Sequence, residues 1–252
     1  MPLHAVARLR AERLARSIKP FLARGGSRVT RCEGCRLPSG HCLCGHVVPQ
    51  ETHAGICLIV GDIEPLKPSN TGWLIADVVQ DTSAFGWSRT EANAELIHLL
   101  TDPQWQPCVV FPGEYATPER VVEAPAPVAA GKRPLFVLLD GTWSEARKMF
   151  RKSPYLDHLP VLSLLPEQLS TYRLRRSTRD DHLCTSEVAA ECLNRAGDVQ
   201  AAHLLQTHLS LYTQRYLQAK QQMTPDRQHP LYQQWLDLAQ ATHGTRMAEA
   251  AP

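Results

Sequence analysis

Four of the eight cysteines lie close together, in the segment CEGCRLPSGHCLC at residues 32–44. They form a CxxC pair and a CxC pair, separated by a loop that contains Pro38 and Gly40. Thiolates at these spacings can surround one tetrahedral Zn²⁺, and a shell of four sulfurs is typical of structural sites. Unlinked or redox-active thiols are the alternative. We predict that the zinc ligands are Cys32, Cys35, Cys42 and Cys44.

A second candidate site lies in the segment LDGTWSE at residues 139–145, where an apolar run turns into a helical pattern. Asp140 is expected at the end of a strand, and ligands of open α/β sheets bind at the carboxyl ends of the strands. Gly141 permits a tight turn and the close approach of a ligand. Thr142 and Glu145 have the spacing of a capping box, so Thr142 also has a purely structural explanation. Asp140 is therefore the candidate for catalysis or ligand binding, with a simple turn residue as the alternative.

Basic side chains gather in two segments that suit a polyanion and on the helix expected after Asp140, where Arg147 and Arg151 are four residues apart. The first 31 residues carry eight arginines and lysines and one acid, and the rest of the chain is net acidic. The segment STYRLRRSTR at 170–179 has four arginines, a tyrosine and no acid. Arginines with an interleaved aromatic suit RNA phosphates and unstacked bases, although a solvated surface is the alternative. The candidate RNA-binding residues are Arg13, Arg16, Arg147, Arg151, Arg173, Arg175, Arg176 and Arg179.

Short apolar runs and helical patterns alternate along the chain and must position these residues. The runs predict strands at 55–61, 84–87, 108–111, 135–140 and 161–165. The helical patterns predict helices over the first 23 residues and at 73–79, 91–100, 142–150, from about 185, and 199–220. Such alternation is typical of an α/β domain with a mostly parallel sheet. We expect a basic N-terminal helix, a zinc knuckle of four cysteines, a catalytic α/β domain and a partly disordered tail, over residues 1–30, 31–50, 51–222 and 223–252.

Composition narrows the class of protein. The 252 residues are 43% hydrophobic and 21% charged, which is typical of a globular protein with a real core. No apolar run approaches the roughly 18 residues of a membrane span, and the N-terminus lacks the apolar stretch of a secretory signal. We therefore expect a cytoplasmic protein whose cysteines bind a metal rather than form disulfides.

The cysteine knuckle, the SNTG loop at 69–72, the DGTW turn, the YRLR segment and the TSE helix start occur in one order over about residues 31–195. In this they resemble the DTW-domain family of tRNA-uridine aminocarboxypropyltransferases, of the bacterial type. The resemblance implies a Rossmann-like α/β fold related to the SPOUT enzymes. A knot in the C-terminal part of the domain is a possible feature of such a fold. It implies transfer of the 3-amino-3-carboxypropyl group of S-adenosylmethionine to N3 of a tRNA uridine, at position 47.

The resemblance carries over residue by residue. Asp140 matches the family's motif and is the best candidate for the general base that removes the N3 proton. Cys184 replaces the family's small hydroxyl residue at the later helix start, and Gly61-Asp62 replaces a His-Pro pair, so no histidine role is carried over. The expected cofactor-binding residues are Asn70, Thr71, Gly72, Gly141, Thr142, Trp143, Thr185 and Glu187.

Two other functions are compatible with these motifs. One is S-adenosylmethionine-dependent methyl transfer to RNA, which uses the same cofactor but a different carbon. The other is a non-catalytic zinc-knuckle protein that binds RNA. The DGTW turn favours an enzyme, and tRNA is the expected partner in the favoured interpretation. The sequence does not decide between a monomer and a homodimer.

Overall fold

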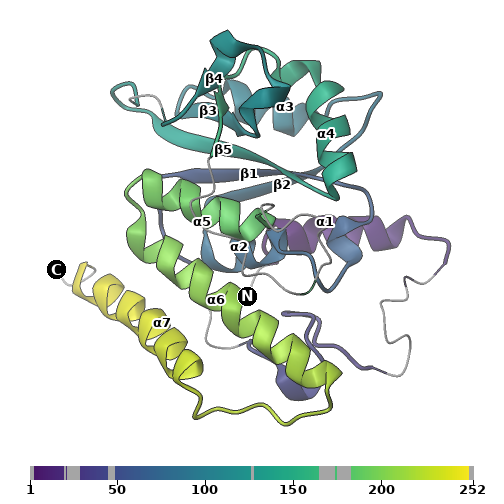
Figure 1. The fold of residues 1–252 in the computed structure, drawn as a ribbon, viewed down its shortest axis with the longest axis vertical. Coiled ribbons are helices and arrows are strands. Elements are labelled where there is room, and N and C mark those ends of the chain that lie inside the picture. The colour runs from purple at the N-terminus through teal and green to yellow at the C-terminus, as the bar shows by residue number, and fades with distance from the viewer. Residues whose placement is uncertain are drawn as a thin grey trace.

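A six-stranded parallel sheet forms the centre of the computed structural model (Figure 1). The structure describes residues 3–19, 21, 29–44, 49–125, 128–164, 174 and 183–249, with side chains to residue 240. The strands are β1 (Gly55–Val60), β2 (Thr82–Gly86), β3 (Trp105–Val110), β4 (Val121–Val122), β5 (Arg133–Asp140) and β6 (Val161–Leu162). Their order in the sheet is β2-β1-β5-β3-β6-β4, which confirms the predicted α/β class.

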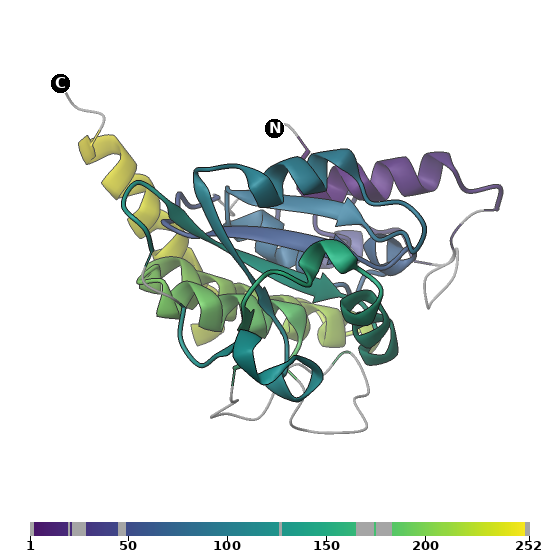
Figure 2. The same cartoon turned by 90° about the horizontal axis from the view of Figure 1, so that it is seen from above.

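Helices cover both faces of this sheet (Figure 2). They are α1 (Ala5–Ala15), α2 (Gly72–Val78), α3 (Ala94–Thr101), α4 (Trp143–Arg151), α5 (Thr185–Arg195), α6 (Val199–Lys220) and α7 (Pro230–Glu249). Helices α1, α2 and α5 pack on one face, with α6 outside α2 and α5 and α7 outside α6, and helices α3 and α4 pack on the other face. Side chains of β1 are buried on both faces, because successive residues of a strand point to opposite sides.

The connections from the neighbouring strands β1 and β5 run toward opposite sides of the sheet. From β1 the chain continues through α2 to β2 on one side, and from β5 it continues through α4 to β6 on the other side. Helix α2 packs on one face and α4 on the opposite face. In open α/β sheets such a switch point leaves a crevice at the carboxyl ends of the two strands, where ligands bind. The fold therefore marks the end of β5 as the place for a site.

The N-terminal helix is shorter than predicted. It ends at Ala15, rather than near residue 23, and Val6 and Leu9 are its buried apolar contacts with the core. Ile18 lies within the predicted helix but beyond its observed end, and it is 99% exposed. Proline disfavours a helical conformation in the residue before it, so Pro20 opposes a continuous helix through this segment.

The C-terminal segment contains helix α7 where a partly disordered tail was predicted. Trp235 of α7 is fully buried and stacks on His208 of α6, with ring centroids 5.8 Å apart. Because an isolated helix is marginal in water, this packing against α6 stabilises α7. The composition of the segment did not predict this helix.

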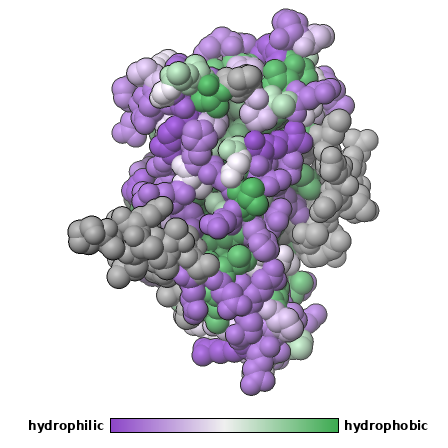
Figure 3. All heavy atoms as spheres, turned by 90° about the vertical axis from the view of Figure 1, so that its left-hand side faces the viewer, coloured by the Kyte–Doolittle hydropathy of each residue, from purple (hydrophilic) through white to green (hydrophobic). Residues whose placement is uncertain are grey.

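Three further observations concern a possible knot, membrane-spanning helices and the hydropathy of the surface. A C-terminal knot would depend on the path between Leu164 and Leu183, which is described only at Leu174, so the knot stays a prediction. None of the helices in the described ranges combines the length and hydropathy that crossing a bilayer requires. One face of the molecule carries mostly hydrophilic side chains, with hydrophobic ones in small scattered groups (Figure 3).

Candidate functional site

Asp140 is the last residue of β5 and lies opposite Val60 in the register with β1. Its side chain is only 1% exposed. One carboxylate oxygen, Oδ2, accepts a hydrogen bond from Asn70 Nδ2 at 2.5 Å, and Oδ1 accepts one from Thr185 Oγ1 at 2.7 Å. The structure thus brings together three residues that were predicted from three separate segments.

Asn70 is held in one orientation by the start of α2. Its Oδ1 accepts a hydrogen bond from the backbone N–H of Trp73 at 3.0 Å, so its amide nitrogen faces Asp140. Thr71 Oγ1 accepts a longer bond, at 3.4 Å, from the backbone N–H of Ser186. These contacts join the first turns of α2 and α5 above the end of β5.

Gly72 permits the close approach of this loop to the carboxylate. A Cβ atom at this position would lie 2.7 Å from Oδ2 of Asp140 and 3.4 Å from Oδ1 of Asn70. A Cβ atom essentially never comes this close to another heavy atom, so any other residue here would force a shift. The Asn-Thr-Gly sequence therefore has a geometric reason: the asparagine donates to Asp140, and the glycine leaves space for it.

Two other predicted cofactor-binding residues cap helices. The Thr142 N–H donates to Glu145 Oε2 at 2.8 Å and the Glu145 N–H donates to Thr142 Oγ1 at 3.3 Å, which confirms the predicted capping box. Glu187 accepts from the N–H of Cys184 at 2.7 Å, at the start of α5. Thr142 and Glu187 thus fix the first turns of α4 and α5, on either side of Asp140. Direct contact of either residue with a cofactor stays a prediction.

Trp143 belongs to an aromatic cluster rather than to the hydrogen bonds around Asp140. Its ring stacks on Phe111, with centroids 5.5 Å apart, and meets the edge of Tyr115 at 6.1 Å. These residues lie on the sheet face that α3 and α4 cover. Packing explains the tryptophan, and its predicted contact with the cofactor is not tested by the structure. Gly141 lies in the turn between Asp140 and this cluster.

The predicted RNA-binding arginines differ in their surroundings. Arg147 and Arg151 are exposed on α4, and Arg16 is exposed just beyond α1. Arg13 instead forms an ion pair with Asp62, with Nε 2.8 Å from Oδ1 and Nη2 2.9 Å from Oδ2. Its charge is therefore engaged within the protein by the loop that departs from the family's His-Pro pair. Four more candidates lie outside the described residues: Arg173, Arg175, Arg176 and Arg179.

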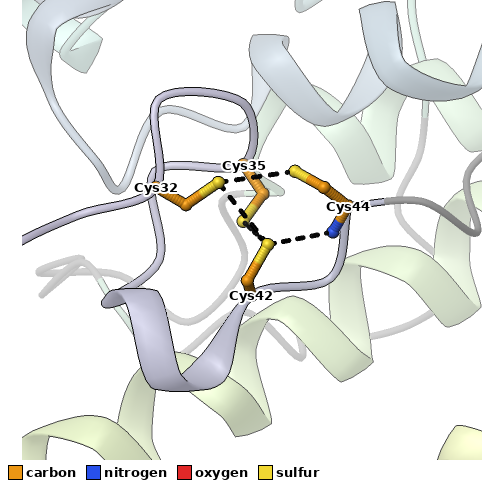
Figure 4. Close-up of side chains that lie close together, drawn as sticks. All are labelled: Cys32, Cys35, Cys42 and Cys44. Atoms are coloured by element: carbon orange, nitrogen blue, oxygen red, sulfur yellow. Dashed lines mark hydrogen bonds between the residues drawn. The ribbon is translucent and has the colours of Figure 1, made fainter.

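The cysteine knuckle brings its four sulfurs within 4.8 Å of one another (Figure 4). Neighbouring sulfurs are 3.5 to 3.7 Å apart. A tetrahedral zinc with Zn–S bonds of about 2.3 Å requires an S–S separation of about 3.8 Å, so the four residues fit the ion. Hydrogen bonds from the Cys44 thiol and from the backbone lower the pKa of Cys35 to about 5, although burial opposes them. This knuckle can therefore hold zinc through Cys32, Cys35, Cys42 and Cys44.

We expect the purified protein to contain one zinc ion per chain and the double variant Cys32→Ser/Cys35→Ser to contain none, because two sulfurs cannot close a tetrahedral shell. Metal analysis after growth in zinc-replete medium measures this. Cys184→Ser is the matched control, since this cysteine lies outside the cluster at the start of α5. Clearly substoichiometric zinc in the parent protein, or zinc retained by the double variant, contradicts the assignment.

Sequence reasoning missed two residues of this region. Ser186 lies in the first turn of α5, and its buried Oγ has no hydrogen-bond partner among the residues that the structure describes. Arg36 lies inside the knuckle, is 3% exposed and donates to backbone carbonyls of the loop before α2. The signal for Arg36 in the sequence was its place directly after Cys35. A metal bound to Cys35 would restrain the backbone of the next residue and thus the direction of its side chain.

Comparison with known proteins adds independent observations. The DTW domain family model matches residues 29–217, which include the knuckle, the Asn70 loop, Asp140 and the start of α5. A curated protein of Drosophila melanogaster, tRNA-uridine aminocarboxypropyltransferase 2, is 27% identical over 176 residues. These cover 66% of this chain and 66% of the relative, slightly less than two thirds of the relative's length. No solved structure matches this chain.

Proposed function

Since this chain belongs to the DTW domain family, we propose that it transfers the 3-amino-3-carboxypropyl group of S-adenosylmethionine to N3 of a tRNA uridine. The relative's name supports a transferase that acts on tRNA uridine. The observation that carries the proposal is the convergence of Asn70, Asp140 and Thr185 at the switch point of the sheet. We also propose that the target is uridine 47 of the tRNA and that the fold is related to that of the SPOUT enzymes.

The residues at the switch point suit S-adenosylmethionine. The buried hydroxyl of Ser186 and the hydroxyl of Thr71 offer polar contacts where the first turns of α2 and α5 meet. We propose that the loop 69–72, the turn at Gly141–Trp143 and the start of α5 hold this co-substrate. Arginines of the 173–179 segment, which lies outside the described residues apart from Leu174, supply candidates for its carboxylate. When bound, S-adenosylmethionine supplies a sulfonium that activates each attached carbon for attack.

The chain must then orient one of these carbons and assist the loss of a proton. Choosing the aminocarboxypropyl carbon over the methyl carbon is a problem of positioning, because both carbons are activated. N3 of uridine is weakly acidic and has to lose its proton before it attacks, and Asp140 is the proposed base. As N3 bonds to the aminocarboxypropyl carbon, the bond between that carbon and the sulfonium sulfur breaks, and 5′-methylthioadenosine leaves. Both oxygens of Asp140 already accept hydrogen bonds, so in the resting site it also orients Asn70 and Thr185. A carboxylate has about four lone-pair sites, so accepting these two hydrogen bonds is compatible with a role as the base.

Nucleoside mass spectrometry tests the proposed reaction. Undermodified tRNA is incubated with the protein and S-adenosylmethionine, digested and analysed, with the co-substrate omitted as the control. A uridine that has gained the mass of one aminocarboxypropyl group is the expected product. A gain of one methyl group would support the RNA methyltransferase instead, and tRNA binding without any product would support the non-catalytic RNA-binding protein.

We further propose that exposed arginines near the carboxyl edge of the sheet bind the tRNA backbone. Arg16→Glu and Arg147→Glu should each weaken tRNA binding and reduce the log–log salt slope by about 0.7 to 0.9 per lost phosphate contact. Binding isotherms at several salt concentrations measure both effects. Lys132→Glu is the matched control, because this exposed lysine precedes β5 at the opposite edge. Arg13 is left unchanged, since a glutamate there would face Asp62.

If all three reversals weakened tRNA binding equally, net charge alone would explain the effect. If Arg16→Glu and Arg147→Glu bound tRNA as the parent does, both arginines would belong to a solvated surface. The expected result is weaker tRNA binding by Arg16→Glu and Arg147→Glu, with S-adenosylmethionine binding unchanged in both variants.

A further inference from the structure

The zinc knuckle extends a side chain into the loop that positions Asn70. Arg36 follows Cys35 and is 3% exposed. Its Nη1 donates a hydrogen bond to the carbonyl of Lys67 at 2.8 Å and its Nη2 donates to the carbonyl of Asn70 at 3.2 Å. The same guanidinium lies over the ring of Trp73, 4.1 Å from its centroid. One side chain thus contacts both ends of the loop and the first turn of α2.

The metal-binding turn determines where Arg36 points. The backbone of Arg36 has a φ of 62°, a left-handed conformation that residues other than glycine rarely adopt. The N–H of Arg36 donates to the carbonyl of Cys32, and the N–H of Cys32 donates to the carbonyl of Leu37, both at 2.8 Å. When Cys32 and Cys35 share one metal ion, the metal–sulfur bonds close this turn as well. The direction of the Arg36 side chain therefore follows from an intact knuckle.

A second remote side chain holds the same loop. Tyr212 of α6 donates its hydroxyl hydrogen to the carbonyl of Pro68 at 2.5 Å, and burial raises the pKa of Tyr212 to about 12. Buried carbonyls outside regular structure need partners, because leaving them unpaired costs the energy of a lost hydrogen bond. The carbonyls of Lys67, Pro68 and Asn70 thus depend on side chains from the knuckle and α6. The position of the Asn70 amide depends on the same contacts.

We propose that Arg36 is a positioning residue that couples the zinc knuckle to the hydrogen bond between Asn70 and Asp140. Zinc then does more than stabilise the knuckle: it fixes the turn that aims Arg36, and Arg36 fixes the loop that presents Asn70 and Gly72. The coupling itself needs only the contacts described here. Its consequence for ligand binding rests on the proposed function, in which this loop holds S-adenosylmethionine.

Arg36→Lys tests the coupling because it keeps the charge but loses the planar fork that spans two carbonyls. Arg215→Lys is the matched control: Arg215 lies one turn beyond Tyr212 in α6, is 2% exposed, donates to the carbonyl of Asp226 and lies over the ring of Tyr232. Three properties are measured in both variants: zinc content, hydrogen exchange at the amides of residues 67–73, and calorimetric binding of S-adenosylmethionine.

Arg36→Lys should keep one zinc ion per chain, exchange faster at residues 67–73 and bind S-adenosylmethionine about tenfold more weakly or worse, because a charge-assisted hydrogen bond is lost. Arg215→Lys should leave the exchange at these residues and the ligand affinity as in the parent. Unchanged exchange and affinity in Arg36→Lys would overturn the coupling. If the parent itself bound no S-adenosylmethionine, the proposed function would fail, and the exchange measurement would still decide the coupling.

A second measurement covers an Arg36→Lys protein that fails to fold or loses its zinc. Hydrogen exchange of the parent is then compared before and after zinc removal by a chelator. Faster exchange at residues 67–73 after chelation, with β1 and β5 still protected, is the expected result. Loss of zinc without any change at residues 67–73 would overturn the coupling.

Discussion

Replacing Asp140 with asparagine is expected to lower turnover by about 100-fold or more, the scale of a lost general base. The variant keeps the shape of the side chain, but its new NH₂ group faces either the amide of Asn70 or the hydroxyl of Thr185, which both donate to Asp140. At a site that is 1% exposed, this mismatch should also lower the free energy of unfolding by about 1 to 3 kcal/mol. Single-turnover rates and thermal unfolding measure the two effects.

The pH dependence separates the two roles of Asp140. If Asp140 removes the N3 proton, a higher pH should partly rescue Asp140→Asn, because the uridine then ionises without help. If Asp140 only orients Asn70 and Thr185, the variant should bind S-adenosylmethionine more weakly and pH should not rescue it. Normal turnover in a well-folded variant would exclude Asp140 from both roles.

Asp198→Asn provides a matched control for Asp140→Asn. Asp198 also accepts two hydrogen bonds, from the backbone N–H groups of His53 and Ala54 at 2.7 and 2.9 Å. These residues precede β1, so Asp198 lies at the opposite edge of the sheet from Asp140. Its replacement should lower stability by a similar mechanism and leave turnover unchanged.

Gly72→Ala is expected to abolish most binding of S-adenosylmethionine, since its Cβ would lie 2.7 Å from Asp140 Oδ2. Either the loop or the carboxylate has to move, and overpacking of this kind typically costs about 1 to 3 kcal/mol. Alanine is the better helix former by about 1 kcal/mol, so helix propensity opposes the loss rather than causing it. Calorimetric titration and thermal unfolding measure the result.

Gly40→Ala is the control for this substitution. A Cβ at Gly40 would meet no atom within 4 Å, so this variant should bind the ligand and unfold as the parent does. If Gly72→Ala also bound normally, the loop would have room to shift. The close approach of Gly72 to Asp140 would then have no role in the site.

Local patterns in the sequence were sufficient where the interacting groups are near one another in the chain. The apolar runs located β1 and β5, because a buried strand is a continuous run of apolar residues. The capping box of Thr142 and Glu145 and the four-cysteine cluster were also predicted, since their members are only a few residues apart. The existence of α7 was missed, because its packing against α6 rather than local preference stabilises it. The end of α1 was missed although Pro20 was a local signal against a longer helix.

The tertiary structure alone decided the contacts that give these patterns a role. Asp140 meets Asn70 and Thr185, which are 70 and 45 residues away in the chain. Arg13, predicted to bind RNA, pairs with Asp62 across 49 residues, and Arg36 reaches Lys67 across 31. Spacing predicts groups that share one turn or one strand, whereas these pairs depend on the order of strands in the sheet and on which face each helix covers. The sequence therefore determined the chemical groups, and the folded chain determined which of them touch.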